Sequence, residues 1–200
     1  AHGAVLFLQG NAEAAAGEFE RAIELDPTLF EAHYFFARAN FQLGRLSVAE
    51  DLFARAGEVD PDDYQAPFFR AQCIEAQGRH DEALVAYAEA LERAEAYMDL
   101  FPDDARAATM RAVGLCRLGR AAEGLDWGGR ALDIDPEDAG VRYNVACLYA
   151  LEGMVEEALD CLEEAIDVGF GNREWLEHDP DIASLRDHPR FPGIMDRAGS

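Results

Sequence analysis

A repeat of 34 residues runs through most of this chain and limits the folds open to it. Pro27 and Pro61 are 34 residues apart, and Pro102 and Pro136 are separated by the same interval. A glycine marks a corresponding earlier place in each repeat. The five glycines are Gly10, Gly44, Gly78, Gly119 and Gly153. A period of this length predicts a stack of small structural units in which each unit contacts only its neighbours.

Each repeat has the pattern of two helices. Glycine ends a helix in the left-handed conformation, and proline stops the next helix. Small residues follow each glycine at two fixed offsets and allow helices to approach closely. A large apolar residue lies between the small ones in most repeats, as Phe19, Phe53, Tyr87 and Leu162. Asp63, Asp104 and Asp138 follow prolines and are predicted to cap the next helix. The sequence therefore predicts an all-α chain.

The order glycine, alanine, aromatic, alanine and proline resembles the tetratricopeptide repeat. The resemblance covers five repeats, at about 1–29, 30–63, 64–104, 105–138 and 139–168, and the first lacks most of its opening helix. It implies a right-handed superhelix (α-solenoid) of antiparallel helix pairs that serves as a protein-binding scaffold without catalysis. Two departures stand out. The usual early aromatic is replaced by His33, Pro67, Ala108 and Arg142, and Gly128 replaces the aromatic of repeat four.

Repeat three is longer than the others, because Pro61 and Pro102 are 41 residues apart instead of 34. Seven added residues turn a helix by about 700°, which leaves its apolar face only about 20° out of phase. The sequence predicts a helix over about 80–100, with an apolar stripe that continues through Ala90, Ala94 and Tyr97. Two interpretations stay open. In the first, the extension packs over the next repeat and bends the superhelix. In the second, it protrudes as an arm that forms a homodimer; an exposed end of the chain could also form such a dimer.

The period fails after Ala165, and residues 169–200 are expected to form short helices that begin at prolines and cap the last repeat. The apolar residues suited to this cap are Trp175, Leu176, Ile182, Leu185, Phe191 and Ile194. With residues 143–147, this tail also resembles the C-terminal ends of larger bacterial signalling proteins. The alternative function is therefore a regulatory, sensor or dimerisation region of such a protein. The chain does not begin with Met, which suggests a fragment or a trimmed form.

The first helix of each repeat has two faces. Counted from the residue after the capping Asp, positions 4, 7, 8 and 11 form the core stripe, and positions 2, 5, 9, 12 and 13 lie on the opposite side. The resemblance implies that positions 2, 5, 9, 12 and 13 line a concave groove, and we call them the groove-side positions. We predict that a peptide or protein segment binds there through Tyr34, Arg38, Phe41, Phe68, Gln72, Thr109, Arg117 and Tyr143. Inner aromatic residues also pack sideways against the next repeat, and this alternative stays open.

Composition argues against nucleic acid and membranes as partners and indicates a reducing compartment. The chain has 40 acidic residues against 17 basic ones, all arginines, and its net charge of −23 would repel nucleic acid. No apolar stretch reaches the roughly 18 residues that a membrane span needs, and no signal peptide is evident. The four cysteines contain no close pair, which favours reduced thiols and a cytoplasmic location.

Catalytic and cofactor patterns are missing from the sequence. Without lysine, P-loop and Schiff-base chemistry are excluded. None of the three serines lies in a nucleophile elbow, and no histidine pair has the spacing of a helical zinc site. We therefore expect no enzyme activity, no cofactor and no metal. Gly124, Gly128 and Gly129 predict close helix contact or a flexible joint, and Trp127 is expected to supply the missing packing.

Overall fold

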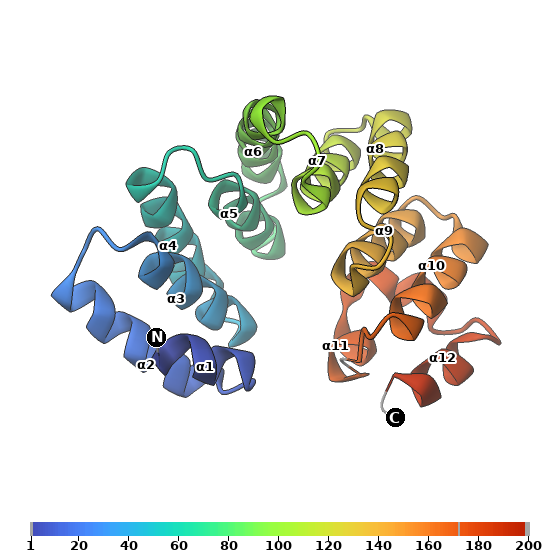
Figure 1. The fold of residues 1–200 in the computed structure, drawn as a ribbon, viewed down its shortest axis with the longest axis horizontal. Helices are drawn as coiled ribbons and strands as arrows, with labels where there is room; N and C mark the ends of the chain where they lie inside the picture. Colours follow the sequence, from blue (N-terminus) through green and yellow to red (C-terminus); the bar gives the residue numbers. More distant parts are fainter. Residues whose placement is uncertain (1, 172, 199–200) are drawn as a thin grey trace. The chain divides into compact units, whose positions relative to one another are not determined.

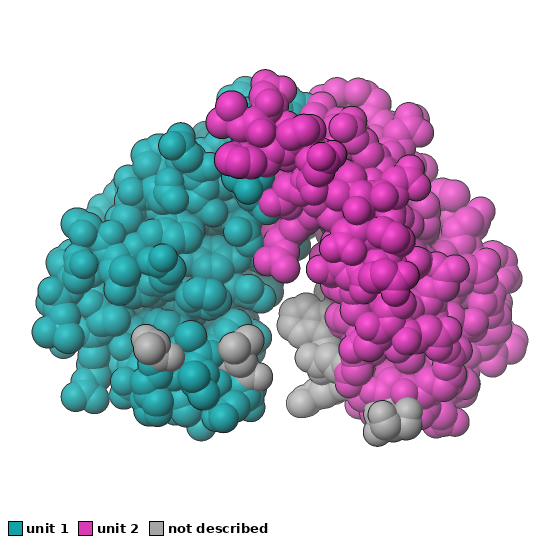
Figure 2. All heavy atoms as spheres, in the orientation of Figure 1, with its two compact units in different colours: residues 1–97 teal, residues 98–200 magenta. Residues whose placement is uncertain are grey.

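The computed structural model describes residues 2–171 and 173–198, and no strand occurs in these ranges. The predicted all-α fold is therefore confirmed. The chain divides into two compact units, residues 1–97 and 98–200, which have different colours in Figure 2. Within each unit, successive helices pack side by side as hairpins (Figure 1).

The described residues of unit 1 form six helical segments joined by short turns. They are α1 (His2–Leu8), α2 (Ala12–Leu25), α3 (Phe30–Gln42), α4 (Leu46–Val59), α5 (Gln65–Ala76) and most of α6 (His80–Leu100). Helix α2 packs against α1 and α3, and α4 packs against α3 and α5. At the predicted small positions, Ala49 and Ala56 are fully buried on either side of Phe53. The absence of larger side chains there lets the helices approach closely.

Unit 2 contains the end of α6 and the C-terminal repeats with their cap. Its further elements are α7 (Ala105–Arg117), α8 (Ala121–Ile134), α9 (Ala139–Leu151), α10 (Val155–Asp167), α11 (Arg173–His178), the 3-10 helix η1 (Pro180–Leu185) and α12 (Phe191–Arg197). Element η1 packs on α9, and α12 packs on α10. The predicted cap residues that join the core are Leu176, Ile182, Leu185, Phe191 and Ile194. The side chain of Trp175, also predicted for the cap, lies outside the described residues.

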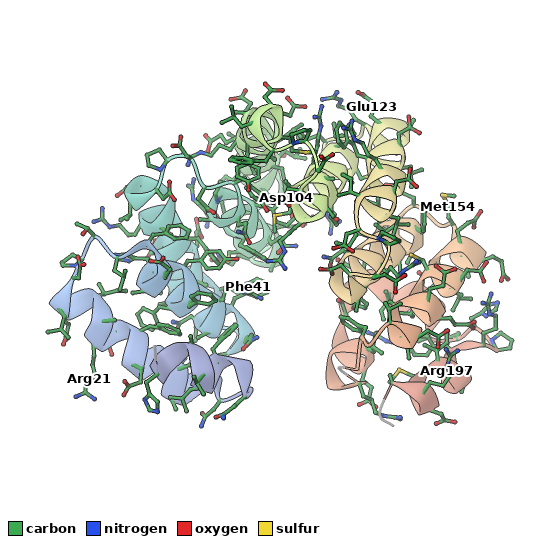
Figure 3. All side chains as sticks on the ribbon, in the orientation of Figure 1. Arg21, Phe41, Asp104, Glu123, Met154 and Arg197 are labelled. Carbon is green, nitrogen blue, oxygen red and sulfur yellow. The ribbon has the colours of Figure 1, made fainter. Side chains whose placement is uncertain are left out.

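Outside the core, Arg190 fixes the cap to α10 by electrostatics. Its guanidinium pairs with Glu156, Asp160 and Glu163, at N–O distances of 3.0, 2.6 and 3.1 Å. On α12, Arg197, labelled in Figure 3, pairs with Asp167 at the end of α10. The cap therefore combines buried apolar contacts with several ion pairs to α10.

Helix ends follow the predicted signals. Asp104 and Asp138 each accept a hydrogen bond from the backbone N–H three residues later, at 2.8 Å in both cases. Asp63 accepts the corresponding bond from Ala66 at 2.6 Å. The five repeat glycines end their helices with φ between 70° and 77°. These positions need the left-handed conformation, which favours glycine.

Replacing Gly44 by alanine is expected to lower the free energy of unfolding by about 1 kcal/mol. The cause is backbone conformation alone, because φ is +70° and an added Cβ would meet no atom within 4 Å. Urea denaturation followed by circular dichroism measures the change. Gly17→Ala is the control, since it lies in open space within α2 without a positive φ and should not destabilise the chain. Equal stability of Gly44→Ala and wild type would contradict the prediction.

The long helix of repeat three is confirmed, because α6 spans His80–Leu100. Ala90 and Ala94 are buried along the predicted stripe. The Tyr97 ring lies 4.5 Å from that of Tyr64, between centroids. The inserted residues therefore keep the apolar face of α6 in phase within unit 1.

Two of the three glycines in α8 lie at close helix contacts. An added Cβ at Gly124 would lie 2.3 Å from Cys116 Sγ, and one at Gly128 would lie 2.9 Å from Leu148 Cδ2. A Cβ added at Gly129 would meet no atom within 4 Å. Leu148 of α9 reaches the position of Gly128. The Trp127 ring lies under the guanidinium groups of Arg111 and Arg130, and its expected role in supplying the missing packing stays a prediction.

Candidate functional site

Two aromatic residues predicted at the groove-side positions of unit 1 are buried between neighbouring helices. Tyr34 is 5% exposed and Phe68 is 6% exposed. The Tyr34 hydroxyl donates a hydrogen bond to Gln65 Oε1 on α5, at 3.0 Å. The Phe68 ring packs edge-on against Phe69 and Tyr87. Both side chains thus pack sideways against neighbouring aromatic rings, and their predicted role in binding stays a prediction.

Arg38 lies on α3 above these rings and is partly exposed. Its guanidinium carbon lies 5.3 Å from the ring centroid of Phe7, 5.8 Å from that of Tyr34 and 5.5 Å from that of Phe69. Attraction to the faces of aromatic rings holds the cation in place. Within the described residues, Arg38 forms no ion pair or hydrogen bond through this guanidinium. Its N–H donors therefore remain available to a ligand.

Phe41 on α3 and Gln72 on α5 are also partly exposed. Phe41 follows Arg38 by three residues on α3, and Gln72 follows Phe69 by three on α5, so each lies one turn along its helix. Figure 3 labels Phe41. In the described part of the chain, the Gln72 side chain has no hydrogen bond. We call Arg38, Phe41 and Gln72 together the Arg38 face, which offers a cation, an aromatic ring and an amide.

In unit 2, the chain's own tail contacts the groove-side positions. The Tyr143 hydroxyl donates a hydrogen bond to Asp179 Oδ2 at 2.5 Å, and its ring stacks on Phe170 with centroids 4.1 Å apart. Burial raises the pKa of Tyr143, so the hydroxyl remains a donor. Arg117 Nη2 lies 3.5 Å from Asp181 Oδ1. These contacts place an acidic segment against α7 and α9.

The remaining predicted residue, Thr109, is 3% exposed on α7. Its hydroxyl donates a hydrogen bond to the Ala105 carbonyl oxygen at 2.8 Å, within the same helix. Four of the predicted residues are thus buried, namely Tyr34, Phe68, Thr109 and Tyr143, and four are partly exposed, namely Arg38, Phe41, Gln72 and Arg117. The partly exposed ones in unit 1 are Arg38 and Phe41 on α3 and Gln72 on α5.

Sequence reasoning missed the docking of the tail on these positions. The cap was predicted from its apolar residues, which explains Ile182 and Leu185 but not the acidic contacts. The available signal was the pair of aspartates, Asp179 and Asp181, that directly precedes Ile182. Their partners Tyr143 and Arg117 lie 36 and 64 residues earlier in the sequence. Only the fold reveals that they meet.

The four cysteines are free, as their spacing predicted. Burial raises the pKa of Cys73 and Cys116 to about 12 and that of Cys161 to about 11. Burial also raises the pKa of Cys147 well above its usual value. Because the thiolate is the reactive form, these side chains are poor nucleophiles in the folded chain.

We expect a thiol-specific reagent to label the native chain slowly at pH 8, with all four thiols becoming reactive in denaturant. The reason is that each thiol stays protonated when its pKa exceeds the solution pH by several units. Absorbance of the released chromophore measures the rate, and free glutathione under the same conditions is the control. Rapid labelling of any cysteine in the native chain would contradict the prediction.

The described residues contain neither a metal cluster nor a membrane span. Across residues 2–171 and 173–198, no set of three or more histidine, cysteine or acidic side chains is arranged to hold a metal ion. Among the helices described, none combines the length and apolar character needed to cross a membrane.

The comparison with family models decides the family. Three models described as "Tetratricopeptide repeat" match residues 6–67, 86–139 and 139–168, which together span more than half of the chain. The chain belongs to the tetratricopeptide repeat family. This tetratricopeptide repeat protein is similar to TTC0263, a thermophilic protein of Thermus thermophilus. The TM-score is 0.72 and the identity 21%, with 92% of this chain and 95% of that chain covered.

Two further similarities are weaker or shorter. MamA from Desulfovibrio magneticus RS-1 matches with a TM-score of 0.54 and 17% identity, over 83% of this chain and 90% of that chain. A curated chloroplastic protein of Arabidopsis thaliana is 38% identical over 61 residues. These residues span 30% of this tetratricopeptide repeat chain and 18% of the chloroplastic protein. The two structural matches support the fold alone.

Proposed function

We propose that this chain is a cytoplasmic, non-catalytic scaffold that binds a peptide or protein segment at the groove-side positions of unit 1. The tetratricopeptide repeat fold supports a role in protein–protein interaction. The observation that carries the location is the Arg38 face. A guanidinium and an aromatic ring are partly exposed one turn apart on α3, and an amide is partly exposed on α5, whose Phe69 ring the guanidinium overlies. Arginine and aromatic residues provide much of the binding energy at protein interfaces.

Affinity capture from the source cell tests this proposal. Wild type is compared with a Phe41→Ala, Gln72→Ala double variant, which removes contact groups but leaves the buried Tyr34 and Phe68 in place. The control is Val48→Ala on α4, which removes an exposed apolar side chain (45% exposed) away from the Arg38 face. We expect partners that the wild type and the control retain and the double variant loses. Identical capture by all three proteins would overturn the location.

A second candidate is a regulatory, sensor or dimerisation region of a larger bacterial signalling protein. The supporting observation is the end of α6, where Leu100 is 75% exposed and Phe101 is 53% exposed. Such adjacent apolar side chains are suited to a second copy of the chain. Sedimentation equilibrium tests self-association, with Leu100→Asp as the disrupting variant. Leu25→Asp, at a site that is 88% exposed on α2, is the control. If the wild type is monomeric, the proposal that α6 mediates dimerisation is ruled out.

A further inference from the structure

Arg38 and Arg130 differ from most arginines of this acidic chain. Each lies over an aromatic ring, and neither pairs with a carboxylate among the described residues. Most other arginines have a carboxylate partner, as in the Arg45–Glu13, Arg79–Glu50 and Arg142–Glu164 pairs. The sequence has 40 acidic residues, and an arginine that none of the described ones contacts keeps its capacity for an external anion. Arg130 is exposed on α8, whereas Arg38 is held among three rings at a groove-side position.

The tail shows which chemistry groove-side positions accept in this chain. Asp179 and Asp181 contact Tyr143 and Arg117, which are groove-side residues of repeats five and four. Ile182, the next residue, is fully buried. An acidic segment followed by an apolar side chain therefore already occupies these positions within unit 2.

We propose that the Arg38 face binds an acidic segment of another protein, with an aspartate side chain on Arg38 and an apolar side chain on Phe41. The inference rests on the proposed function and names its ligand class. A guanidinium offers a planar set of donors that fits a carboxylate in two parallel hydrogen bonds. The aromatic rings beneath Arg38 fix its position before the ligand arrives, which lowers the entropy lost on binding. Gln72 adds an amide that donates to or accepts from the peptide backbone.

Peptide binding to the full chain tests this inference. The probe is a fluorescent heptapeptide with capped ends and the sequence of residues 179–185, Asp-Pro-Asp-Ile-Ala-Ser-Leu. A second peptide carries asparagine in place of both aspartates, and a third keeps the asparagines but has a free C-terminal carboxylate. Fluorescence anisotropy measures the affinities for wild type and for the variants Arg38→Gln, Arg117→Gln and Arg130→Gln.

We expect the capped acidic peptide to bind wild type about tenfold or more tightly than the asparagine peptide does, because a charge-assisted pair is lost. Arg38→Gln should remove this difference. Arg130→Gln is the matched control, because it also removes a guanidinium stacked on a ring, and it should bind as wild type does. Higher salt should weaken binding to wild type and change binding to Arg38→Gln little.

Three results with the capped peptides would overturn the inference. The first is equal binding of the acidic and asparagine peptides, and the second is wild-type affinity of Arg38→Gln. The third is loss of binding in Arg117→Gln instead, which places the peptide where the tail docks. Binding of only the peptide with a free carboxylate would also overturn it, in favour of a chain terminus. Capture of partners that depends on Phe41 and Gln72 but not on Arg38 leaves the proposed function standing and rejects the acidic ligand. Circular dichroism confirms that each variant is folded.

Discussion

Replacing Gly124 by alanine is expected to destabilise the chain by about 3 kcal/mol, at the upper end of the typical cost of overpacking. The added Cβ would lie 2.3 Å from Cys116 Sγ and 2.7 Å from the Ala112 carbonyl oxygen. The second contact is with the backbone of α7, so a side-chain rotation does not relieve it. Helices α7 and α8 would have to separate. Urea denaturation followed by circular dichroism measures the loss.

The same helix provides a matched control. Gly129→Ala meets no atom within 4 Å and should stabilise the chain by roughly 0.5–1 kcal/mol, because alanine is the better helix former. Adding Cys116→Ala to Gly124→Ala should recover only part of the loss, since the contact with the Ala112 oxygen remains. Similar effects of Gly124→Ala and Gly129→Ala would show that backbone entropy alone governs this helix and would contradict the prediction.

Replacing Ile182 by alanine is expected to lower the free energy of unfolding of unit 2 by about 2–5 kcal/mol, the usual cost of emptying a buried aliphatic site. Ile182 is fully buried in the core that α9 and α10 share with the tail. In a repeat array, each helix hairpin depends on its neighbour, so a weakened cap exposes the last repeat first. Hydrogen–deuterium exchange should therefore rise in α9 and α10 before it rises in unit 1.

The neighbouring Ala183 gives the control for this prediction. It is exposed on the same 3-10 helix, and Ala183→Ser should change stability by no more than about 0.5 kcal/mol. Uniform exchange along the whole chain in Ile182→Ala would indicate one cooperative structure and contradict the expected order of opening. Unchanged exchange in α9 and α10 would show that the cap does not stabilise the last repeat.

Much of the fold was predictable, because it depends on signals that act within a few residues. The glycine at each first-helix end needs a positive φ, and the capping aspartates bond to N–H groups three residues away. The bounds of α6 followed from helical periodicity, which an insertion of two turns barely disturbs. Gly128 shows the limit of this reasoning. The side chain that fills its space, Leu148, comes from α9, and no local rule connects the two.

The candidate site was predictable only as a set of positions. Periodicity assigned Tyr34 and Arg38 to the same helix side, but it could not show that Tyr34 would be buried by Gln65 and nearby rings while Arg38 stayed partly exposed above them. Likewise, Arg117 and Tyr143 were predicted on the groove side, where the tail contacts them through Asp181 and Asp179. Exposure depends on what other segments cover, and periodicity within one helix does not contain that information.

The amino-acid pattern alone specifies the helical hairpins, their ends, their repeat length and the family to which the chain belongs. These properties come from backbone conformation, local hydrogen bonds and the spacing of small residues, which are all encoded within one repeat. Tertiary structure decided which groove-side residues remain available, how α8 accommodates its glycines and where the acidic tail docks. Those outcomes depend on contacts between residues distant in sequence, whose partners are fixed only when the helices pack.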